Sequence, residues 1–359
     1  MKSIVEERIS RNEFVLVAEI GVNYYDIATK EHISNMDAAK LMIDEAKKAG
    51  IHAVKFQTYK ANTLAAKESP YYWDLNEEPT RSQFELFQKY DTFGKDEYAE
   101  LAAYCEEKGI EFMSTPFDVE SVEYLDDMMN VYKISSSDLN NLPFVEMMAK
   151  KNKPIMLSIG ASEEEEIRRT VSLIRKYNSQ KLILLHCVLE YPTPYEDANL
   201  NKIVTLKREF PDCIIGYSDH TKPDSNYDVI KTAYNLGAQV IEKHYTLDKT
   251  LKGNDHYHAM DEKDAKNIIE EIEKINKIRG TYELKCLETE AKARSNARRS
   301  VVAKCDINKG TKIERDMLTF KRPASGIPIN EMELVIGRTA KEDIKEDTIL
   351  QYAMLDGEK

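Results

Sequence analysis

The sequence predicts an α/β chain in which a (β/α)8 TIM barrel is followed by a small β-rich domain. Three observations support this prediction. Short β-branched runs alternate with longer amphipathic segments up to about residue 278, and these runs suffice for eight strand-helix units. No glycine fingerprint of the GxGxxG kind follows the first run, which argues against an open doubly wound sheet.

The predicted elements follow in order along the first 280 residues. Strands are expected to end in the segments 17–20, 53–58, 110–115, 131–135, 155–160, 183–187, 214–218 and 239–244. Amphipathic helices are expected between them, among others at 36–50, 95–109, 162–178 and 228–237. Residues 60–94 form a longer insertion that is too aromatic and too amphipathic for a linker, so we expect it to fold over the barrel mouth as a lid.

The domain organisation is predicted from the change of pattern after the last helix. Residues 1–280 form the barrel, 281–295 a polar linker, and 296–359 the small domain. Within that domain, residues 303–313 and 340–350 share Ala, Lys, Asp, Ile and Thr at equal offsets. The repetition predicts a pseudo-symmetric β domain.

Composition and charge exclude several classes of protein. The chain has 359 residues and a formal net charge of −12, which opposes nucleic-acid binding. Its five cysteines are scattered without a CxxC pair, which is typical of a reducing compartment. The start of the chain has charges where a signal peptide needs an apolar run, and no apolar stretch is long enough to span a membrane. We therefore expect a soluble, cytoplasmic protein with no membrane partner.

Polar residues stand at the carboxyl ends of the predicted strands, where barrel enzymes carry their active sites. They are Glu19, Asn23, Lys55, Gln57, Thr115, Lys133, Ser135 to Asp138, Ser158, His186, Ser218, His220, Glu242, Lys243 and His244. The candidate active site is thus assembled from all eight strands.

Two histidines among these residues predict a metal site. His220 and His244 are 24 residues apart, which is one strand-helix repeat, so they should lie at the mouths of adjacent strands. With a carboxylate such as Glu19 or Asp255 they would suit Mn²⁺ or another first-row divalent ion. The alternative to a metal site is that each histidine only caps its strand end with hydrogen bonds.

Two lysines predict an anion site. Lys55 and Lys133 end otherwise apolar strands, and burying two ammonium groups is costly unless an anion shares the site. The neighbouring hydroxyl groups suit a phosphate together with a carboxylate. In the alternative, each lysine pairs with a barrel carboxylate such as Glu19 or Asp138.

Short motifs occur in collinear order from residue 18 to about residue 328. They read AEIGVN, VKFQTY, STPFD, YKISSSDLNN, LSIGAS, YPTPYEDANL, GYSDHT, IEKHYTLD, RRSVVAKCDINKGT and KRPASGIP. This ordered set resembles the sialic acid synthase family, whose members condense phosphoenolpyruvate with an N-acetylated hexosamine to give nine-carbon 2-keto acids.

The resemblance implies roles for individual residues. His220 and His244 would hold the metal, most readily Mn²⁺, with Mg²⁺ or Co²⁺ as other choices. The substrates would be bound by Lys55, Gln57, Thr115, Lys133, Ser136, Ser158, Tyr191 and Ser218. The tail would be an antifreeze-like SAF (β-clip) domain whose Arg322 reaches the sugar in a partner's barrel, which implies a domain-swapped homodimer.

The implied chemistry is attack of the enol carbon of phosphoenolpyruvate on the open-chain aldehyde of the sugar, polarised by the metal. Water then adds to the resulting oxocarbenium ion, and phosphate leaves with C–O cleavage. Glu19 or Asp138 would manage a proton, and Glu19 is the preferred candidate.

Several positions depart from the family's usual pattern. Tyr24 stands where many members have histidine, Leu189 stands where a polar residue is common, and 135–138 lacks the usual glycine. Residues 252–259, KGNDHYHA, replace a Gly-Pro-Asp sequence. The acceptor therefore stays open between N-acetylmannosamine and the diacetamido-trideoxyhexoses. Two further alternatives are a barrel that accepts a phosphorylated sugar and a catalytically silent carbohydrate-binding protein.

Overall fold

The computed structural model describes residues 3–253 and 255–357, and the chain divides into two compact units. The first unit is Met1–Arg279 and the second is Gly280–Lys359. The predicted linker 281–295 belongs to the second unit and contains a short 3₁₀ helix, Glu288–Glu290, and most of the helix α13 (Ala291–Ala297).

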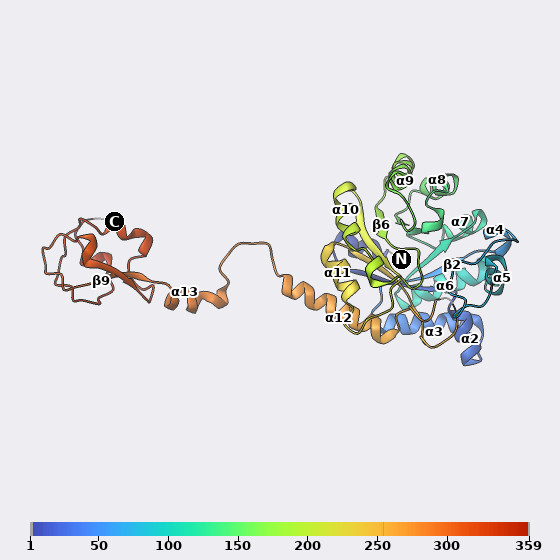
Figure 1. Cartoon of the computed structure of the whole chain (residues 1–359), viewed down its shortest axis with the longest axis horizontal. Helices are drawn as coiled ribbons and strands as arrows, with labels where there is room; N and C mark the ends of the chain where they lie inside the picture. Colours follow the sequence, from blue (N-terminus) through green and yellow to red (C-terminus); the bar gives the residue numbers. More distant parts are fainter. Residues whose placement is uncertain (1–2, 254, 358–359) are drawn as a thin grey trace. The chain divides into compact units, whose positions relative to one another are not determined.

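Within the described part of the first unit, eight parallel strands form a single sheet (Figure 1). They are β1 (Val15–Gly21), β2 (Ala53–Thr58), β3 (Glu111–Pro116), β4 (Tyr132–Ile134), β5 (Ile155–Ser158), β6 (Leu182–His186), β7 (Ile214–Asp219) and β8 (Val240–His244). Their order is β3-β2-β1-β8-β7-β6-β5-β4, and β3 also packs beside β4. The sheet thus closes into the predicted barrel, and every predicted strand is present.

The first unit also contains helices, most of which surround the strands and cover their outer face (Figure 1). They are α1 (Ile4–Ser10), α2 (Tyr24–Glu31), α3 (Asn35–Lys48), α4 (Ala61–Leu64), α5 (Gln83–Lys89), α6 (Lys95–Lys108), α7 (Val119–Leu125), α8 (Leu142–Lys150), α9 (Glu164–Tyr177), α10 (Asn201–Glu209), α11 (Asp228–Leu236) and α12 (Glu262–Arg279). The predicted helices correspond to α3, α6, α9 and α11.

Local sequence explains where these helices begin and end. The Ser34 hydroxyl accepts a hydrogen bond from the Asp37 amide, 3.0 Å away, at the start of α3. The Asp118 carboxylate does the same for the Ser121 amide at the start of α7. Gly109 ends α6 with a φ of 66°, a conformation that glycine adopts without steric cost.

The interior of the barrel is apolar at its amino-terminal end. Successive residues of a strand point to opposite faces, so alternate positions line the interior. The interior cluster contains Val5, Ile9, Val15, Val17, Ala53, Met113, Val131, Met156, Ile183, Leu185 and Val240. Gly216 belongs to this wall, because a Cβ there would lie 2.6 Å from the Val240 carbonyl oxygen.

Helix α1 closes this end of the barrel. Val5 and Ile9 project into the apolar cluster. The Ser3 hydroxyl donates to the Glu111 carboxylate at 2.7 Å, and the Val5 amide donates to the same carboxylate at 2.7 Å. The sequence prediction did not include this helix.

The insertion 60–94 contains α4 and α5, and a buried tryptophan ties its own segments together. The Trp73 indole nitrogen donates to the carbonyl oxygens of Glu78 and Thr80 at 3.1 and 3.0 Å. Its residues line the cavity at the carboxyl ends of the strands, as described below. The prediction that this insertion covers the barrel mouth is confirmed.

The second unit has a small core and a short antiparallel sheet of β9 (Ser300–Ala303) with β10 (Leu318–Lys321). The two related segments of its sequence pair with each other. Ile307 and Ile344, which occupy the same offset in the two segments, exchange backbone hydrogen bonds of 2.7 and 2.8 Å. This reciprocal pairing is what a local two-fold pseudo-symmetry requires.

Among the residues that the structure describes, none of the helices combines the length and the apolar character that crossing a membrane would require.

Candidate active site

A cavity of about 430 Å³ opens at the carboxyl ends of the strands. The residues that were assigned a catalytic, binding or metal role within the barrel all line it: Glu19, Lys55, Gln57, Thr115, Lys133, Ser136, Asp138, Ser158, Tyr191, Ser218, His220 and His244. Two other polar residues expected at the strand ends, His186 and Lys243, do not line it, because His186 bonds to the Ala198 carbonyl oxygen and Lys243 pairs with Asp219. The remaining predicted residue, Arg322, lies in the second unit, where it is exposed. Their individual roles stay predictions, but the residues of the barrel share one cavity.

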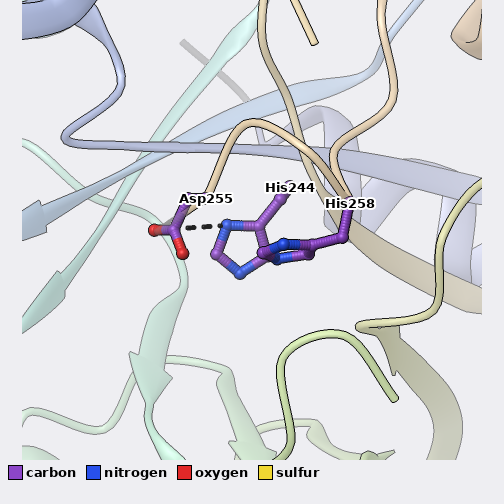
Figure 2. Close-up of side chains that lie close together, drawn as sticks. All are labelled: His244, Asp255 and His258. Atoms are coloured by element: carbon purple, nitrogen blue, oxygen red, sulfur yellow. Dashed lines mark ion pairs between the residues drawn. The ribbon is translucent and has the colours of Figure 1, made fainter. Parts of the chain in front are cut away.

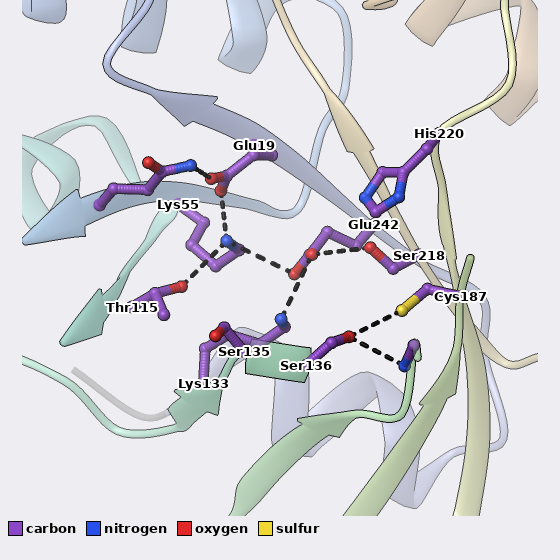
Figure 3. A network of polar contacts seen from close by, with 12 residues as sticks. Glu19, Lys55, Thr115, Lys133, Ser135, Ser136, Cys187, Ser218, His220 and Glu242 are labelled. Carbon is purple, nitrogen blue, oxygen red and sulfur yellow. Dashed lines mark hydrogen bonds and ion pairs between the residues drawn. The ribbon is translucent and has the colours of Figure 1, made fainter. Parts of the chain in front are cut away.

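The floor of the cavity is a network of buried charges (Figure 3). The Lys55 ammonium contacts the Glu19 carboxylate and lies 3.7 Å from Glu242 Oε2. The Lys133 ammonium lies 3.5 Å from Glu242 Oε1. Glu242 therefore lies between the two lysines, and the four side chains come from the four strands β1, β2, β4 and β8.

Burial changes the protonation behaviour of these groups. It raises the pKa of Glu19 and lowers the pKa of Lys133, because the charged form of each group loses its hydration. Burial also opposes ionisation of Glu242, but the adjacent Lys133 and Lys55 outweigh it and lower the pKa of that carboxyl. The network therefore places two lysines against one carboxylate whose ionised form they favour.

Both lysines pair with barrel carboxylates, as the alternative explanation of the lysines expected. Lys55 does pair with Glu19, but Lys133 pairs with Glu242 and not with Asp138. Asp138 lies beyond the end of β4 on the 3₁₀ helix Ser136–Asp138, and its carboxylate accepts hydrogen bonds from Ser135 and Asn141. Burial raises the pKa of Asp138.

Hydroxyl groups surround the lysines. Lys55 Nζ donates to Thr115 Oγ1 at 3.1 Å, and Ser218 Oγ donates to Glu242 Oε1 at 2.9 Å. Ser136 Oγ accepts from the Gly160 amide at 2.9 Å. Ser158 Oγ is buried and has no hydrogen-bond partner among the described residues. The rim therefore offers donors for an anion, including one that the protein leaves unused.

Glu19 is oriented by its neighbour on β2. Gln57 Nε2 donates to Glu19 Oε1 at 2.8 Å, while the other carboxylate oxygen of Glu19 contacts Lys55. A carboxyl with a raised pKa that is held at a cavity wall is suited to exchange a proton with a bound molecule.

His220 directly follows β7, His244 is the last residue of β8, and both face the same part of the cavity. Their ring centroids are 5.5 Å apart, and Tyr191 packs against both rings. His220 Nδ1 donates to the Val188 carbonyl oxygen at 2.6 Å, which leaves Nε2 as the available ligand atom. Burial lowers the pKa of His220 to about 4, so its imidazole is neutral at pH 7, as metal binding requires.

A group of side chains that could hold a metal ion includes His244 but not His220. Its members are His244, Asp255 and His258, whose ligand atoms all lie within 4.8 Å of one another (Figure 2). His244 Nδ1 and both ring nitrogens of His258 are buried without a hydrogen-bond partner in the described residues. Unpartnered buried imidazoles beside a carboxylate fit a first-row divalent ion well.

Sequence reasoning assigned no role to Glu242 and did not identify His258. Glu242 precedes His244 by two residues on the same strand, so the alternation of a strand places both on the interior face. This alternation could have identified Glu242 as a residue of the site from the sequence. His258 is brought to His244 by the loop after β8, where Tyr245 pairs with Met260, and no local pattern predicts such a return.

The two departures at Tyr24 and Leu189 lie in different environments. Tyr24 is fully buried in the hydrophobic core, where its ring stacks on those of Tyr25 and Phe93. Leu189 lines the cavity. Of these two departures, the one at Leu189 faces the space that a substrate would occupy. Asn254 in the loop sequence KGNDHYHA lies outside the described residues.

Comparison with known proteins agrees with this architecture. The pattern of the NeuB family matches residues 42–283, and that of the SAF domain matches residues 298–356. An N,N'-diacetyllegionaminic acid synthase of Campylobacter jejuni is 36% identical over 345 residues, covering 94% of this chain and 98% of that protein. The human N-acetylneuraminate-9-phosphate synthase is 31% identical over 347 residues, covering 95% and 92%.

A solved structure gives the same result. The N-acetylneuraminic acid synthetase of Leptospira borgpetersenii matches with a TM-score of 0.66 at 33% identity, covering 78% of this chain and 90% of that chain. The predicted fold, a TIM-like barrel followed by a SAF domain, is confirmed.

Proposed function

This chain belongs to the NeuB family, and we propose that it condenses phosphoenolpyruvate with an unphosphorylated N-acetylated hexosamine and water. The products are a nine-carbon 2-keto acid and phosphate. The named relatives are synthases of legionaminic, pseudaminic and N-acetylneuraminic-9-phosphate type. The family relation supports the reaction class, and the cavity supports the assignment of residues.

One observation carries the proposal: two buried lysines meet at a single carboxylate on the cavity floor, ringed by hydroxyls. Phosphoenolpyruvate carries a carboxylate and a phosphate, so it offers one anionic group to each lysine. Ser158 and Ser136 add donors on the side of Lys133, and Thr115 adds one beside Lys55.

Binding in this way orients the enol. With both anionic groups held, C3 of phosphoenolpyruvate faces the upper part of the cavity, where the sugar aldehyde enters. The new bond joins C3 to the aldehyde carbon and leaves an oxocarbenium ion at C2 and a negative charge on the former aldehyde oxygen, which becomes a hydroxyl by taking up the proton that the attacking water later releases. The buried carboxylates Glu19 and Glu242 stabilise this positive charge in a site from which bulk water is largely excluded.

Glu19 handles the proton of the attacking water. Its raised pKa lets it accept that proton as the hydroxyl adds to C2, and the hemiketal phosphate then breaks its C–O bond to release phosphate. Asp138, further out on the cavity wall, binds a sugar hydroxyl. A divalent ion at the histidine cluster would supply Lewis-acid polarisation of the aldehyde oxygen, and Mn²⁺ is the first ion to test.

The lining of the upper cavity supports an unphosphorylated acceptor. Among the described residues that line the cavity, Lys55 and Lys133 are the lysines, and there is no arginine. Lys60 of the lid is engaged with the carbonyl oxygens of Asp91 and Phe93 at 2.6 and 2.8 Å. A second phosphate would therefore find no further cation among the described residues of this chain that line the cavity.

The lid instead presents apolar and aromatic side chains: Leu64, Tyr72, Trp73, Leu86, Phe87 and Tyr90. Such a surface suits a deoxy sugar with acetamido groups, because methyl groups gain from contact with aromatic faces. The acceptor proposed first is thus the diacetamido-trideoxyhexose that leads to N,N'-diacetyllegionaminic acid, the product class of the relatives at 36% and 34% identity.

The testing experiment is release of phosphate from phosphoenolpyruvate by Mn²⁺-loaded protein. The acceptor panel contains the two diacetamido-trideoxyhexoses, N-acetylmannosamine and N-acetylmannosamine 6-phosphate. We expect release with an unphosphorylated acceptor and a nine-carbon product by mass spectrometry. With ¹⁸O in the bridging position of phosphoenolpyruvate, the label should appear in phosphate.

One control variant and two alternative outcomes decide how that experiment is interpreted. Lys133→Met should raise the phosphoenolpyruvate KM by at least about tenfold without altering the fold, since one anion partner is lost. Release only with the 6-phosphate would favour the phosphorylated-acceptor alternative. Sugar binding without any release from folded, metal-loaded protein would favour the catalytically silent alternative.

The second unit is proposed to complete the sugar site of a partner chain. Arg322 is exposed, so its guanidinium is free to meet an acetamido oxygen in another barrel of a swapped homodimer. Mixing His220→Ala chains with Arg322→Ala chains should then restore part of the activity, because some sites receive both intact residues. No recovery in demonstrated mixed dimers would contradict the swap.

A further inference from the structure

His258 is a buried histidine on the loop that follows β8. It is fully buried, and neither Nδ1 nor Nε2 has a hydrogen-bond partner among the described residues. His186, His220 and His256 are also buried, but each bonds to an oxygen atom. Buried polar groups are nearly always satisfied, so two unused nitrogens on one ring call for a ligand.

The surroundings of His258 identify the kind of ligand. Its ring centroid lies 4.8 Å from that of His244, and the two ring planes make an angle of 63°. Asp255 Oδ2 lies 3.5 Å from His244 Nδ1. Figure 2 shows the carboxylate facing His244 and the ring of His258 beside it. Two imidazoles and a carboxylate form a donor set for a divalent transition metal.

The distances suit one ion after small side-chain rotations. One ligand atom from each of the three residues lies within 4.8 Å of the others. Ligand atoms bound to a tetrahedral zinc ion at about 2.1 Å are about 3.4 Å apart. The required approach is on the order of 1 Å, which changes of χ angles can supply.

The backbone around His258 is held in place. Tyr245 pairs with Met260, and the Met260 amide donates to the His244 carbonyl oxygen at 2.8 Å. His256 is bonded to Thr246 and Asp26, and the Tyr257 hydroxyl donates to the Tyr191 carbonyl oxygen at 2.7 Å. The loop thus presents His258 to His244 in a fixed position.

We propose that His258 is a direct metal ligand, together with His244 and Asp255, and that it shifts the ion preference of this chain toward Zn²⁺ and Co²⁺. The resemblance implied only His220 and His244 as metal ligands. Each added imidazole favours later first-row ions over Mn²⁺, which prefers oxygen ligands. The inference deepens the proposed function and rests on it for the role of the ion, but metal binding itself does not require that function.

A packing role for His258 is the competing explanation. Its ring also contacts those of Tyr191 and Tyr257, with centroids 5.6 and 5.0 Å away. Phenylalanine would preserve these aromatic contacts while removing both nitrogens. His258→Phe therefore separates the two explanations.

The experiment measures metal affinity of the full-length protein without substrates. Chelator-stripped wild type and His258→Phe are titrated with Zn²⁺, Co²⁺ and Mn²⁺ against a chromophoric competitor. The matched control is His32→Asn, since His32 is exposed and has a φ of 56°, which asparagine tolerates. Thermal melts of the stripped proteins check that each variant folds.

The expected result is selective. His258→Phe should weaken Zn²⁺ and Co²⁺ binding by about 100-fold or more and Mn²⁺ binding by less, and it should change the visible spectrum of bound Co²⁺. His32→Asn should match wild type. The proposal would be overturned if a folded His258→Phe variant bound each of the three ions with the same affinity as wild type.

A second measurement does not depend on the variant. In crystals of wild type soaked with Zn²⁺, anomalous scattering at the zinc edge should place the ion within bonding distance, about 2.1 Å, of a His258 nitrogen. An ion bound by His220 and His244 and remote from His258 would overturn the proposal.

These outcomes are distinguishable from failure of the proposed function. If wild type binds Zn²⁺ through His258 but releases no phosphate with any acceptor, the function fails and the metal site stands. If wild type is an active synthase and His258→Phe binds all three ions normally, the function stands and the metal site fails.

Discussion

The two ends of the barrel interior are equally buried but chemically opposite. At the amino-terminal end Met113 is 0% exposed within an apolar cluster, and at the carboxyl end Lys55 is 3% exposed within a network of charges. The interior changes from apolar to charged within two residues of one strand, from Ala53 to Lys55 on β2 and from Val240 to Glu242 on β8. Burial alone therefore does not separate the part of the barrel that stabilises it from the part that functions.

The difference between the two ends indicates where burial of side chains costs this protein free energy. Apolar burial at one end contributes to stability, whereas burying lysines and glutamates at the other end costs free energy that their pairing only partly offsets. Such a cost persists where the groups are needed for binding or chemistry. Exchanging the two kinds of residue should therefore have opposite consequences.

The largest expected effect comes from that exchange. Met113→Lys should destabilise the fold by more than about 4 kcal/mol, because an unpaired ammonium would be buried among apolar side chains. Lys55→Met combined with Glu19→Gln should keep the free energy of unfolding or raise it, while lowering kcat/KM by at least about 10³-fold. Chemical denaturation and phosphate release measure the two quantities.

The contrast would be broken by either of two results. One is a Met113→Lys protein with an ordinary unfolding curve, and the other is a double variant that loses stability to the same extent. A double variant that stays folded and fully active would remove Lys55 and Glu19 from the proposed reaction.

Substitutions of two glycines, one at each end of the barrel, are expected to have effects of intermediate size. In Gly216→Ala the new Cβ would meet the Val240 carbonyl oxygen at 2.6 Å, so we expect a loss of about 1–3 kcal/mol in unfolding free energy. In Gly160→Ala it would meet Cys187 Sγ at 2.8 Å and Ser136 Oγ at 2.9 Å. Displacing that hydroxyl should raise the phosphoenolpyruvate KM by about tenfold.

The measurements are a urea titration and a KM determination on both variants. A matching loss of substrate affinity in Gly216→Ala would show that the two ends are not separate in function.

A smaller effect is expected from pH. Burial lowers the pKa of Lys133, so this amine loses its proton at a lower pH than an ordinary lysine, for which the value is about 10.4. Anion binding needs the charged form, so the phosphoenolpyruvate KM should be flat near neutrality and rise severalfold on the alkaline side before that value is reached. Steady-state kinetics from pH 7 to 10 test this.

Lys133→Arg provides the comparison, because arginine keeps its charge throughout this range. The alkaline rise should disappear in this variant even if its KM at pH 7 is higher. An identical rise in both proteins would assign the titration to another group.

The smallest effect is expected at the closed end of the barrel. Ser3 caps α1 by accepting from the Glu6 amide at 3.1 Å and also donates to Glu111. Ser3→Ala should lower the free energy of unfolding by about 1 kcal/mol and leave the kinetic constants unchanged, since this end does not contact the cavity. A changed KM would contradict that separation.

Much of the fold was readable from local patterns. Alternating strand and helix segments specify the barrel, because each segment carries its own period of apolar residues. The same order places the ends of the strands, so Lys55, Lys133 and His244 could be assigned to one rim before any contact was known. The aromatic insertion 60–94 likewise indicated its lid position.

What the sequence by itself determined is therefore the barrel, the appended small domain and the rim on which the polar side chains gather. Only the tertiary structure decided which partners they meet: Glu242 faces both lysines, whereas its neighbour Lys243 points away and pairs with Asp219 at 2.6 Å. It also decided that the loop after β8 returns His258 to His244. The physical reason is that a strand's position along the chain is local information, whereas side-chain contacts across the barrel depend on register and loop closure between distant segments.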